Sequence, residues 1–428
     1  MLNIRMKKSQ AIIFILLILT LFTLNSIFMN ANKFEVSEMP EMIDHDHISS
    51  QKLFDNSWKI IRDNYYDEDL NNQAWGRWKE HYHGKIKTDD DAKVAIDTML
   101  ASLNDPYSRY MSKTEYLDQN NSINSKITGI GVNITSIAGK IHIVNVMDGT
   151  PAQFANLLPD DIILAIDGKE VNGLTLSEVA NLVRGPENSF VNITILRNKD
   201  KLIKRVMRKE IKIKTVKSAI VDKNIGYIQI TSFIGSTTPN EFLEALEKTK
   251  DTKGLILDLR GNTGGLLPNA IFIANLFLPE GSNIVSIVGR NGYKYDINAQ
   301  DTEFGVKKPT IVLVDGNSAS ASEILSGALK DYNKAKLLGT KTYGKGMVQK
   351  IIPMPNETGL NLTIAKYLTP KGTDINKKGI TPDIKVEFSI KDVKTNNDAQ
   401  LQAAKNILSK MLPGRALSCR YGFLKRIY

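Results

Sequence analysis

The sequence predicts a chain of several domains that combines α/β and α+β organisation. Three observations indicate this fold class. Apolar residues follow helical spacing from about 51 to 117, alternate between turns from about 128 to 197, and then form short strands that alternate with helical segments from about 211. The 428 residues, 42% hydrophobic and 24% charged, suffice for two or three domains.

Composition excludes some function classes. The net charge is +10, but the lysines are spread along the chain and no basic run is interleaved with aromatic residues, so no nucleic-acid partner is expected. The single cysteine, Cys419, excludes an intramolecular disulfide framework.

The N-terminal residues are typical of an export signal. Three basic residues precede an apolar run from Ala11 to Leu24, which continues to Met29. The positive start should remain in the cytoplasm and place the rest of the chain outside it. No small-x-small cleavage site follows and the full span approaches the length of a membrane helix, which favours a retained anchor over a cleaved signal.

The remaining segments follow in order. A polar, acidic linker contains the motif DHDH at Asp44 to His47. A metal site is not expected there, because the sequence supplies no third ligand at a suitable spacing. Helices are expected next, then a β-rich domain with a helix at Leu176 to Val183, then an α/β domain. The predicted boundaries are 1–31 for the signal or anchor, 32–50 for the linker, 51–120 for the helical region, 121–205 for the β-rich domain, 206–390 for the α/β domain and 391–428 for a C-terminal helix and basic tail.

A strand, a turn and a helix indicate the functional centre. Thr310 to Val314 is an apolar strand, Asp315 to Asn317 is a turn, and the apolar spacing from Ser320 to Leu329 is helical. The serines and alanines at the helix start leave backbone N–H groups uncrowded, where partial positive charge gathers. Such a corner suits a serine nucleophile, although a plain helix cap or flexible turn has the same composition.

The choice of base follows from the histidines, none of which lies beyond His142. If the C-terminal half is self-contained, a lysine is the expected base. Lys345 lies between two glycines, and burial in an apolar pocket would lower its pKa. The alternative of a phosphate-binding loop is disfavoured because Met347 follows GKG where Ser or Thr would be required.

The motifs SASASEI and GALKDYNKAKLLGTKTYGKGMVQ resemble the catalytic core of the C-terminal processing peptidases, or tail-specific proteases, which are Ser-Lys enzymes of peptidase family S41. The resemblance implies that Ser320 is the nucleophile and Lys345 its general base. It also implies that Gln349, one helical turn beyond the lysine, orients the amine. Asp331 corresponds to a position of importance in the family and is interpreted as structural support for the site.

Further motifs extend this resemblance over residues 51 to 390. LNDPYSRYM at 103–111 resembles the family's LDPHSRYM, with departures at Asn104 and Tyr107 in a region expected to be non-catalytic. RGNTGG resembles the RGNPGG turn of a crotonase-like protease fold. The resemblance implies an oxyanion hole made by Gly264 or Gly265 together with Ala321.

The β-rich segment resembles a PDZ domain, on the residues GIGVNI and GTPAQFANLLPDDIILAIDGKEV. In that fold a glycine-containing loop offers backbone N–H groups to the terminal carboxylate of a peptide, which adds a strand to the sheet edge. The loop residues here are Gly129, Ile130, Gly131 and Val132. Arg184 follows the predicted helix and is expected either to contact the protease domain or to form an exposed salt bridge.

These expectations combine into a serine endopeptidase of the bacterial cell envelope, on the extracytoplasmic side, that recognises the C-terminal tails of protein substrates and cleaves nearby bonds. No metal or organic cofactor is implied. An adaptor or activator protein, the membrane and a second copy of the chain are further candidate partners. A catalytically silent PDZ scaffold is the main alternative. A β-lactam-recognising acyl hydrolase is disfavoured because Ser320 to Glu323 lacks the SxxK pattern.

Overall fold

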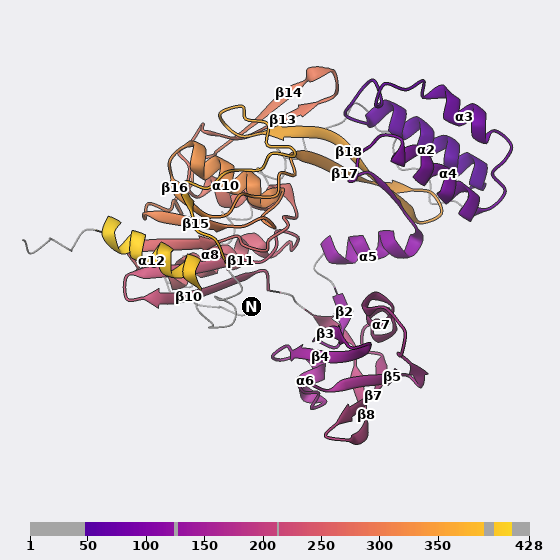
Figure 1. The fold of residues 1–428 in the computed structure, drawn as a ribbon, viewed down its shortest axis with the longest axis horizontal. Helices are drawn as coiled ribbons and strands as arrows, with labels where there is room; N and C mark the ends of the chain where they lie inside the picture. Colours follow the sequence, from indigo (N-terminus) through magenta and orange to yellow (C-terminus); the bar gives the residue numbers. More distant parts are fainter. Residues whose placement is uncertain (1–47, 124–126, 212–213, 389–397, 413–428) are drawn as a thin grey trace, which may run out of the picture. The chain divides into compact units, whose positions relative to one another are not determined.

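The computed structural model describes residues 48–123, 127–211, 214–388 and 398–412. The chain divides into two compact units (Figure 1). One unit comprises Asp118–Lys214, and the other combines the residues before and after it. This other unit, called the larger unit below, is therefore built from two stretches that are distant in sequence. The expected signal or anchor lies outside the described residues, and no helix in the described part of the chain is long and apolar enough to span a membrane.

The larger unit contains a six-stranded sheet in the order β10-β11-β12-β15-β16-β19. β10 is antiparallel to β11, whereas all other neighbours are parallel. The predicted alternation of apolar strands and helices is confirmed. The strands are β10 (Val216–Asp222), β11 (Ile225–Ile230), β12 (Gly254–Asp258), β15 (Thr310–Val314), β16 (Ala335–Gly339) and β19 (Ile384–Lys385).

Helices cover both faces of this sheet because successive strand residues point to opposite sides. Leu255, Leu257 and Val312 belong to the main core, which includes residues of α8 (Thr238–Lys248), α9 (Leu267–Asn275) and α10 (Ala321–Asp331). The alternate strand residues Ile256, Ile311 and Leu313 pack with Ala404 and Leu408 of α12 (Ala399–Met411) in a separate cluster. The C-terminal helix therefore completes the second face of the sheet (Figure 1).

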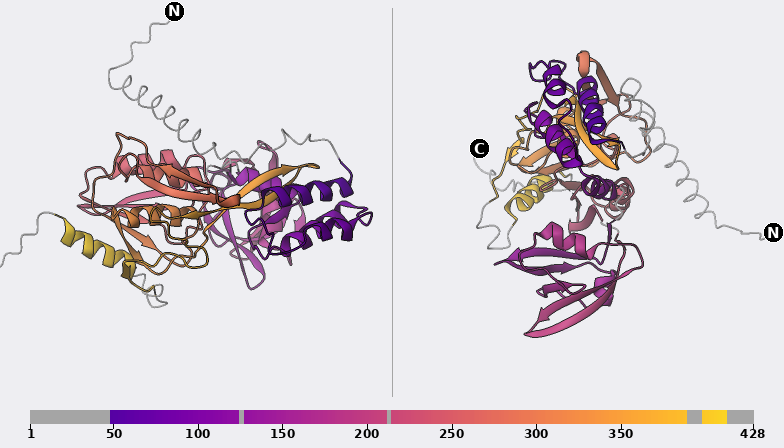
Figure 2. Two further views of the ribbon diagram at one scale, coloured as in Figure 1. Left: turned by 90° about the horizontal axis from the view of Figure 1, so that it is seen from above. Right: turned by 90° about the vertical axis from the view of Figure 1, so that its right-hand side faces the viewer.

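A second sheet joins the N-terminal helices to this body. Its long strand β18 pairs with β17, and also with β1 and β13 at different points along its length. The helices α2 and α4 lie beside one end of the β17 and β18 hairpin (Figure 2). The elements are α2 (Ser50–Asn64), α3 (Gly76–Tyr82), α4 (Asp89–Ala101), β1 (Arg109–Met111), β13 (Asn283–Gly289), η1 (Arg290–Gly292), β14 (Lys294–Asn298), β17 (Met347–Met354) and β18 (Thr358–Leu368).

The smaller unit is a β-sheet domain with its own apolar core, in which all buried residues come from within the domain. The sheet order is β3-β4-β5-β7-β8, so β3 and β8 form its two edges. The predicted helix is confirmed as α7 (Leu176–Val183). The other elements are β3 (Val132–Ile137), β4 (Lys140–Val146), α6 (Pro151–Phe154), β5 (Ile162–Ile166), β6 (Lys169–Glu170), β7 (Phe190–Arg197) and β8 (Asp200–Met207), with a separate β2 (Ile127–Gly129) and β9 (Lys209–Ile211) pair. The helix α5 (Lys113–Ile123) contains the boundary between the two units at Asp118.

Candidate active site

Ser320 lies where β15 turns into α10. Asp315 fixes the turn, because its carboxylate accepts the N–H groups of Ser318 and Gly261, both at 3.0 Å. The Ser318 hydroxyl donates to the Leu259 carbonyl at 2.8 Å and so ties the turn to the end of β12. Ser320 itself has φ 54° and ψ −113°, a strained conformation for a non-glycine residue. The surrounding bonds hold the serine in this conformation at the start of the helix.

Glu323 connects the candidate nucleophile to the candidate base. This carboxylate is fully buried in the first turn of α10. Its Oε2 accepts the backbone N–H groups of Ser320 and Lys345, both at 2.9 Å. Its Oε1 accepts the Thr342 hydroxyl at 2.6 Å and the Gly344 N–H at 2.7 Å. A single oxygen atom therefore bonds both backbones, which places the two nitrogens within two hydrogen-bond lengths of each other.

Tyr367 forms a second connection between the same two segments. Its ring is buried in β18, and its hydroxyl lies 2.7 Å from the Lys345 carbonyl and 3.2 Å from the Ser320 carbonyl. Burial, followed by the nearby carboxylate of Glu323, raises the pKa of Tyr367 well above its ordinary value. The phenol is therefore a neutral donor that holds the two backbones together.

The amine of Lys345 lies in a partly buried, aromatic environment. Burial lowers the pKa of Lys345, and the carboxylate of Asp105 opposes this shift. The Nζ atom lies 4.8 Å from the centre of the Tyr107 ring.

The glycine turn after β12 lies against the start of α10. A Cβ atom on Gly264, at φ +103°, would lie 2.9 Å from the Ser320 Cβ and 3.1 Å from the Ala321 nitrogen, so only glycine allows this approach. The Gly264 N–H donates to Asn262 Oδ1 at 2.9 Å. Within the described residues, the N–H groups of Gly265 and Ala321 have no acceptor. Of the two glycines, Gly265 therefore has the available donor.

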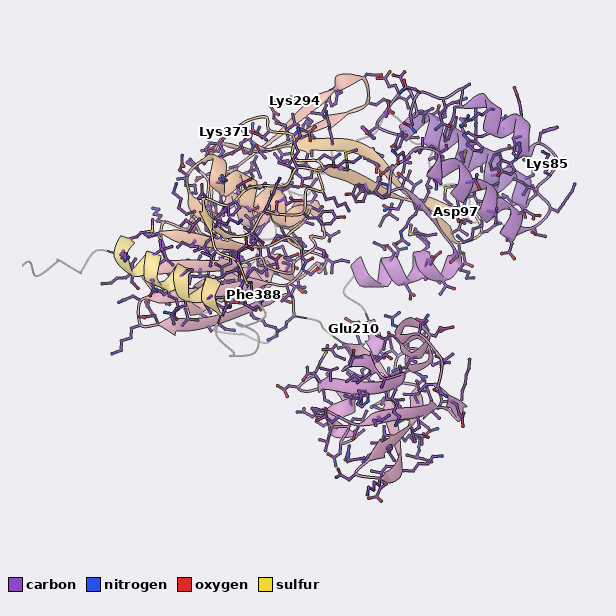
Figure 3. All side chains as sticks on the ribbon, viewed as in Figure 1. Lys85, Asp97, Glu210, Lys294, Lys371 and Phe388 are labelled. Carbon is purple, nitrogen blue, oxygen red and sulfur yellow. The ribbon has the colours of Figure 1, made fainter. Side chains whose placement is uncertain are left out.

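Gln349 and Asp331 differ from the expected geometry. Gln349 lies in the extended strand β17, so the predicted helical turn after Lys345 is wrong. Its side-chain amide donates to Thr363 Oγ1 at 3.4 Å. Asp331 ends α10, at the opposite end of the helix from Ser320, and accepts the backbone N–H of Lys371 at 3.0 Å in the turn after β18. Lys371 is labelled in Figure 3. Its observed contact is thus with a supporting loop.

In the smaller unit, the loop predicted to bind a peptide carboxylate lies between β2 and β3 and is called the carboxylate loop below. The carbonyls of Ile130 and Gly131 accept the N–H groups of Ala152 and Met147, at 2.8 Å and 2.9 Å. The N–H groups of these two loop residues have no acceptor among the residues described. Gly131 has φ +86°, and a Cβ there would lie within 2.5 Å of the Thr150 side chain. Gly129 ends β2 and Val132 begins β3 on either side of this turn.

Arg184 pairs with a residue of α5. Its guanidinium forms an exposed pair with Asp118 at 3.3 Å and lies 3.2 Å from the side-chain oxygen of Asn181. This is the exposed salt bridge that the sequence allowed as one of two outcomes.

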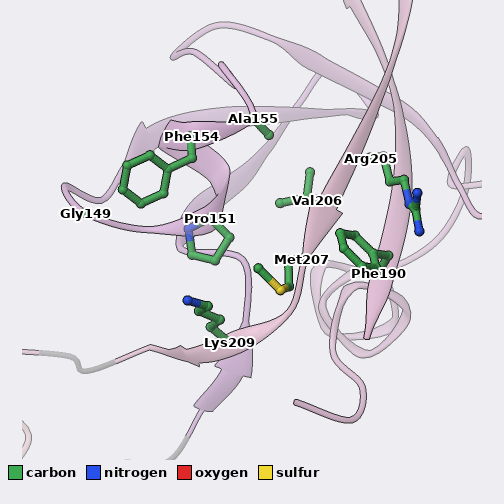
Figure 4. A pocket seen from close by; sticks show the side chains of 9 residues that line it. All are labelled: Gly149, Pro151, Phe154, Ala155, Phe190, Arg205, Val206, Met207 and Lys209. Atoms are coloured by element: carbon green, nitrogen blue, oxygen red, sulfur yellow. The ribbon is translucent and has the colours of Figure 1, made fainter. Parts of the chain in front are cut away.

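A separate apolar pocket of about 240 Å³ lies in the same unit (Figure 4). Phe190 and Arg205 contribute to it from β7 and β8, with the guanidinium 4.0 Å from the ring centre, and Phe154 comes from α6. The full lining is Gly149, Pro151, Phe154, Ala155, Phe190, Arg205, Val206, Met207 and Lys209. None of the four residues of the carboxylate loop belongs to it.

Three residues of the site were not found from the sequence. Glu323 stands three residues after Ser320, and this spacing is that of a helix-capping box, which could have signalled its contact with the Ser320 N–H. Tyr367 gave no local signal because it lies in a strand of mixed apolar and polar residues that contains no recognisable catalytic motif. Tyr107 fell in a region interpreted as non-catalytic, yet its ring lies next to Lys345.

Comparison with known proteins identifies the family. The model of peptidase family S41 matches residues 224–386, that of the PDZ domain residues 128–206, and that of the tricorn protease C1 domain residues 49–93. A carboxyl-terminal-processing protease of Synechocystis sp. is 36% identical over 373 residues, which cover 84% of this chain and 87% of that protein. The chain belongs to peptidase family S41. It is a serine-type carboxyl-terminal processing protease with a PDZ domain.

Other relatives agree with this assignment. The carboxy-terminal processing protease CtpA of Bacillus subtilis is 40% identical over 325 residues, which cover 74% of this chain and 68% of that protein. The solved photosystem II D1 C-terminal processing protease has a TM-score of 0.54 and 29% identity, over 79% of this chain and 94% of that chain. An S41 protease of Bacteroides fragilis, with a TM-score of 0.57 and 18% identity over 87% of this chain and all of that one, shares the fold.

Proposed function

We propose that this protease uses Ser320 and Lys345 as a catalytic dyad and selects its substrates by binding their C-terminal tails to the PDZ domain. The observation that carries the proposal is the Glu323 carboxylate, whose single oxygen bonds the backbones of both residues. A buried carboxylate with four donors holds a fixed geometry, and catalysis depends on such preorganisation.

The first half of the reaction forms an acyl-enzyme. The Ser320 hydroxyl attacks the carbonyl carbon of the scissile peptide bond, and its proton passes to the neutral Lys345 amine. Burial favours this neutral form, since it lowers the pKa of the amine. The negative charge on the substrate oxygen is stabilised by the N–H groups of Gly265 and Ala321, each typically contributing about 2.7–4 kcal/mol. The C–N bond then breaks, and Lys345 gives the proton to the leaving amine.

The second half releases the product. Water attacks the ester carbonyl while Lys345 accepts one of its protons, and the same two N–H groups stabilise the second oxyanion. The ester C–O bond breaks, the Ser320 oxygen recovers a proton from the protonated Lys345, and the new C-terminal carboxyl group leaves and loses its remaining proton to solvent as a carboxylate. Gln349 and Asp331 act in this scheme as supports, through the strand that follows the lysine and the loop at the far end of α10.

Substrate selection is assigned to the PDZ loop. The unbonded N–H groups of Ile130 and Gly131 support binding of a terminal carboxylate, and the β3 edge supports addition of a peptide strand. The apolar residues of α7 and β3 suit an apolar tail. We place the enzyme in the bacterial envelope, attached or exported through the N-terminal apolar segment, because that segment carries the features of an export signal.

The test is hydrolysis of a loosely folded protein with an apolar C-terminal tail, followed by gel electrophoresis and mass spectrometry. We expect Ser320→Ala and Lys345→Ala to abolish cleavage while they retain tail binding. Lys345→Arg should fail as well, because arginine does not deprotonate at accessible pH. Wild-type cleavage by either alanine variant would contradict the dyad, and binding without cleavage by the wild type would favour a scaffold.

A second comparison separates recognition from chemistry. Gly131→Leu should weaken tail binding, because its side chain would collide with Thr150 and φ +86° disfavours it. Hydrolysis of a short reporter peptide, which does not depend on tail capture, should change much less. Equal losses in the two assays would argue against separate roles for the loop and the dyad.

A further inference from the structure

Tyr107 is the side chain that faces the amine of the candidate base. Tyr107 belongs to the loop between α4 and β1, in the N-terminal stretch of the larger unit. Lys345 comes from the loop before β17 of the same unit. The Nζ atom lies 4.8 Å from the centre of its ring, a distance at which the negative face of an aromatic ring attracts an ammonium group. The ring is partly buried, so it separates one side of the amine from solvent.

The loop that carries Tyr107 is held at both of its sides. Asp105 accepts the Tyr107 N–H at 3.0 Å and the Ser108 hydroxyl at 2.6 Å. The Asn361 side chain in β18 donates to the Tyr107 carbonyl at 3.0 Å, and the Thr363 N–H donates to Ser108 Oγ at 3.0 Å. The backbone of this loop is therefore fixed relative to the strand that also carries Tyr367.

The same strand relates this loop to Gln349. Thr363 accepts the Gln349 side-chain amide through its hydroxyl and donates its N–H to Ser108. The loop of Tyr107 and the residue expected to orient the base are thus supported by one residue of β18. Through Thr363, the N-terminal loop is therefore connected by hydrogen bonds to the strand that follows Lys345.

Several titratable groups surround the amine. Asp105 is the carboxylate whose charge opposes the lowering of the Lys345 pKa. Burial raises the pKa of Tyr107, and the phenol of Tyr343 and the carboxylates of Asp105 and Glu323 contribute in the same direction. Tyr107 therefore presents a neutral ring to the amine, and its contribution comes from the π face and from the exclusion of water.

We propose that Tyr107 is a positioning residue for the base: its ring holds the Lys345 amine at the site and shields it from bulk water. The proposal rests on the proposed role of Lys345. The two effects of the ring oppose each other, since the π face favours the ammonium form while the exclusion of water favours the free amine. Variants that remove one or both effects can therefore be distinguished.

The test measures kcat and KM for a short reporter peptide as a function of pH, using the full chain. Tyr107→Phe keeps both effects, so its pH profile should match the wild type, with kcat within about threefold. Tyr107→Ala admits water, so the rising limb of the profile should shift upward by about one pH unit, with roughly tenfold lower kcat/KM at pH 7. KM should change little.

Tyr107→Leu retains apolar cover but lacks the π face. Its kcat should fall by about tenfold because the amine is less well held, while the rising limb should shift downward or stay in place. This variant also maintains the test if the alanine variant does not fold, as judged by thermal denaturation. Tyr293→Ala, which removes an exposed tyrosine of the same unit, is the matched control and should retain the wild-type profile.

The outcomes separate this inference from the proposed function. If Tyr107→Ala and Tyr107→Leu keep the wild-type profile and kcat while Ser320→Ala and Lys345→Ala are inactive, the dyad stands and the role of Tyr107 is refuted. If Tyr107→Phe behaves like Tyr107→Ala, the hydroxyl is the important group and the ring-face argument is refuted. If Lys345→Ala remains active, the proposed function itself fails.

Discussion

Replacing Glu323 by glutamine should damage both stability and catalysis. The carboxylate accepts four hydrogen bonds, from Thr342, Gly344, Ser320 and Lys345. A glutamine oxygen can accept about two of them, and its NH₂ group would then face the remaining donors. Each buried donor that loses its acceptor costs about 1–3 kcal/mol, so the free energy of unfolding should fall by roughly 2–6 kcal/mol.

Part of the lost free energy should appear as a higher activation barrier for peptide hydrolysis. The lost bonds are those that hold Ser320 and Lys345 together, and a misplacement that costs 2.7 kcal/mol of transition-state stabilisation lowers the rate by about a hundredfold. We therefore expect kcat for a short reporter peptide to fall by about a hundredfold or more, with a small change in KM. Urea denaturation of the same preparation gives the free energy of unfolding.

Glu241→Gln provides the matched control. Glu241 in α8 also accepts four hydrogen bonds, but from Thr215, Val216 and Thr237, and it bonds no residue of the candidate site. This variant should lose stability and retain kcat. The reasoning is refuted if Glu323→Gln retains kcat within threefold of the wild type, or if the two variants lose activity equally.

Three further predictions concern the glycine turn, the base and the C-terminal helix. Gly264→Ala should lower kcat by about a hundredfold, because the new Cβ would lie 2.9 Å from the Ser320 Cβ; peptide hydrolysis measures this. Lys345→Met should raise the free energy of unfolding, because burial disfavours the charged lysine. This gain should shrink as the pH rises from the lowered pKa of Lys345 to its ordinary value of 10.5, since in that range the unfolded wild-type chain binds more protons than the folded one. Asp398→Ala should cost about 1 kcal/mol or more, because Asp398 caps α12 and pairs with Arg260 at 2.7 Å; urea denaturation measures this.

The loss of stability caused by Asp398→Ala should depend on pH. Burial would raise the pKa of this carboxyl, but the hydrogen bonds from Arg260 outweigh burial and lower it. Asp398 therefore stabilises the folded chain fully at a pH above its ordinary pKa, and this stabilisation is lost as the pH falls through its lowered pKa. The argument for the glycine turn is contradicted if Gly264→Ala retains the wild-type kcat. The argument for the base is contradicted if the stability gained by Lys345→Met grows with pH. The argument for the helix is contradicted if the stability lost by Asp398→Ala is constant down to acidic pH.

Local sequence signals were sufficient for several individual elements. The apolar strand Thr310–Val314, the helix after it and α7 were predicted close to their observed bounds, since burial and periodicity determine them locally. The prediction for the segment after Lys345 was wrong: it placed Gln349 one helical turn beyond the lysine, whereas pairing with β18 makes β17 a strand. Strand pairing of this kind depends on distant residues that a local pattern does not contain.

The candidate site was only partly accessible for a similar reason. Ser320 and Lys345 belong to compact motifs and could be selected by residue chemistry. Glu323 resembles a simple helix cap, and its contacts with the loop before β17 exist only in the folded chain. Tyr107 lies 238 positions before Lys345 in the sequence, so no spacing could relate the two.

β18 has a consequence for biosynthesis. Asn361 in this strand bonds the Tyr107 carbonyl across 254 residues, and β1 pairs with the same strand. As the chain leaves the ribosome, the N-terminal helices emerge long before their partner, while the PDZ domain has its complete core much earlier. The hydrolytic centre therefore cannot form until translation has passed β18, so a nascent chain can acquire its peptide-binding domain well before it acquires the ability to cut.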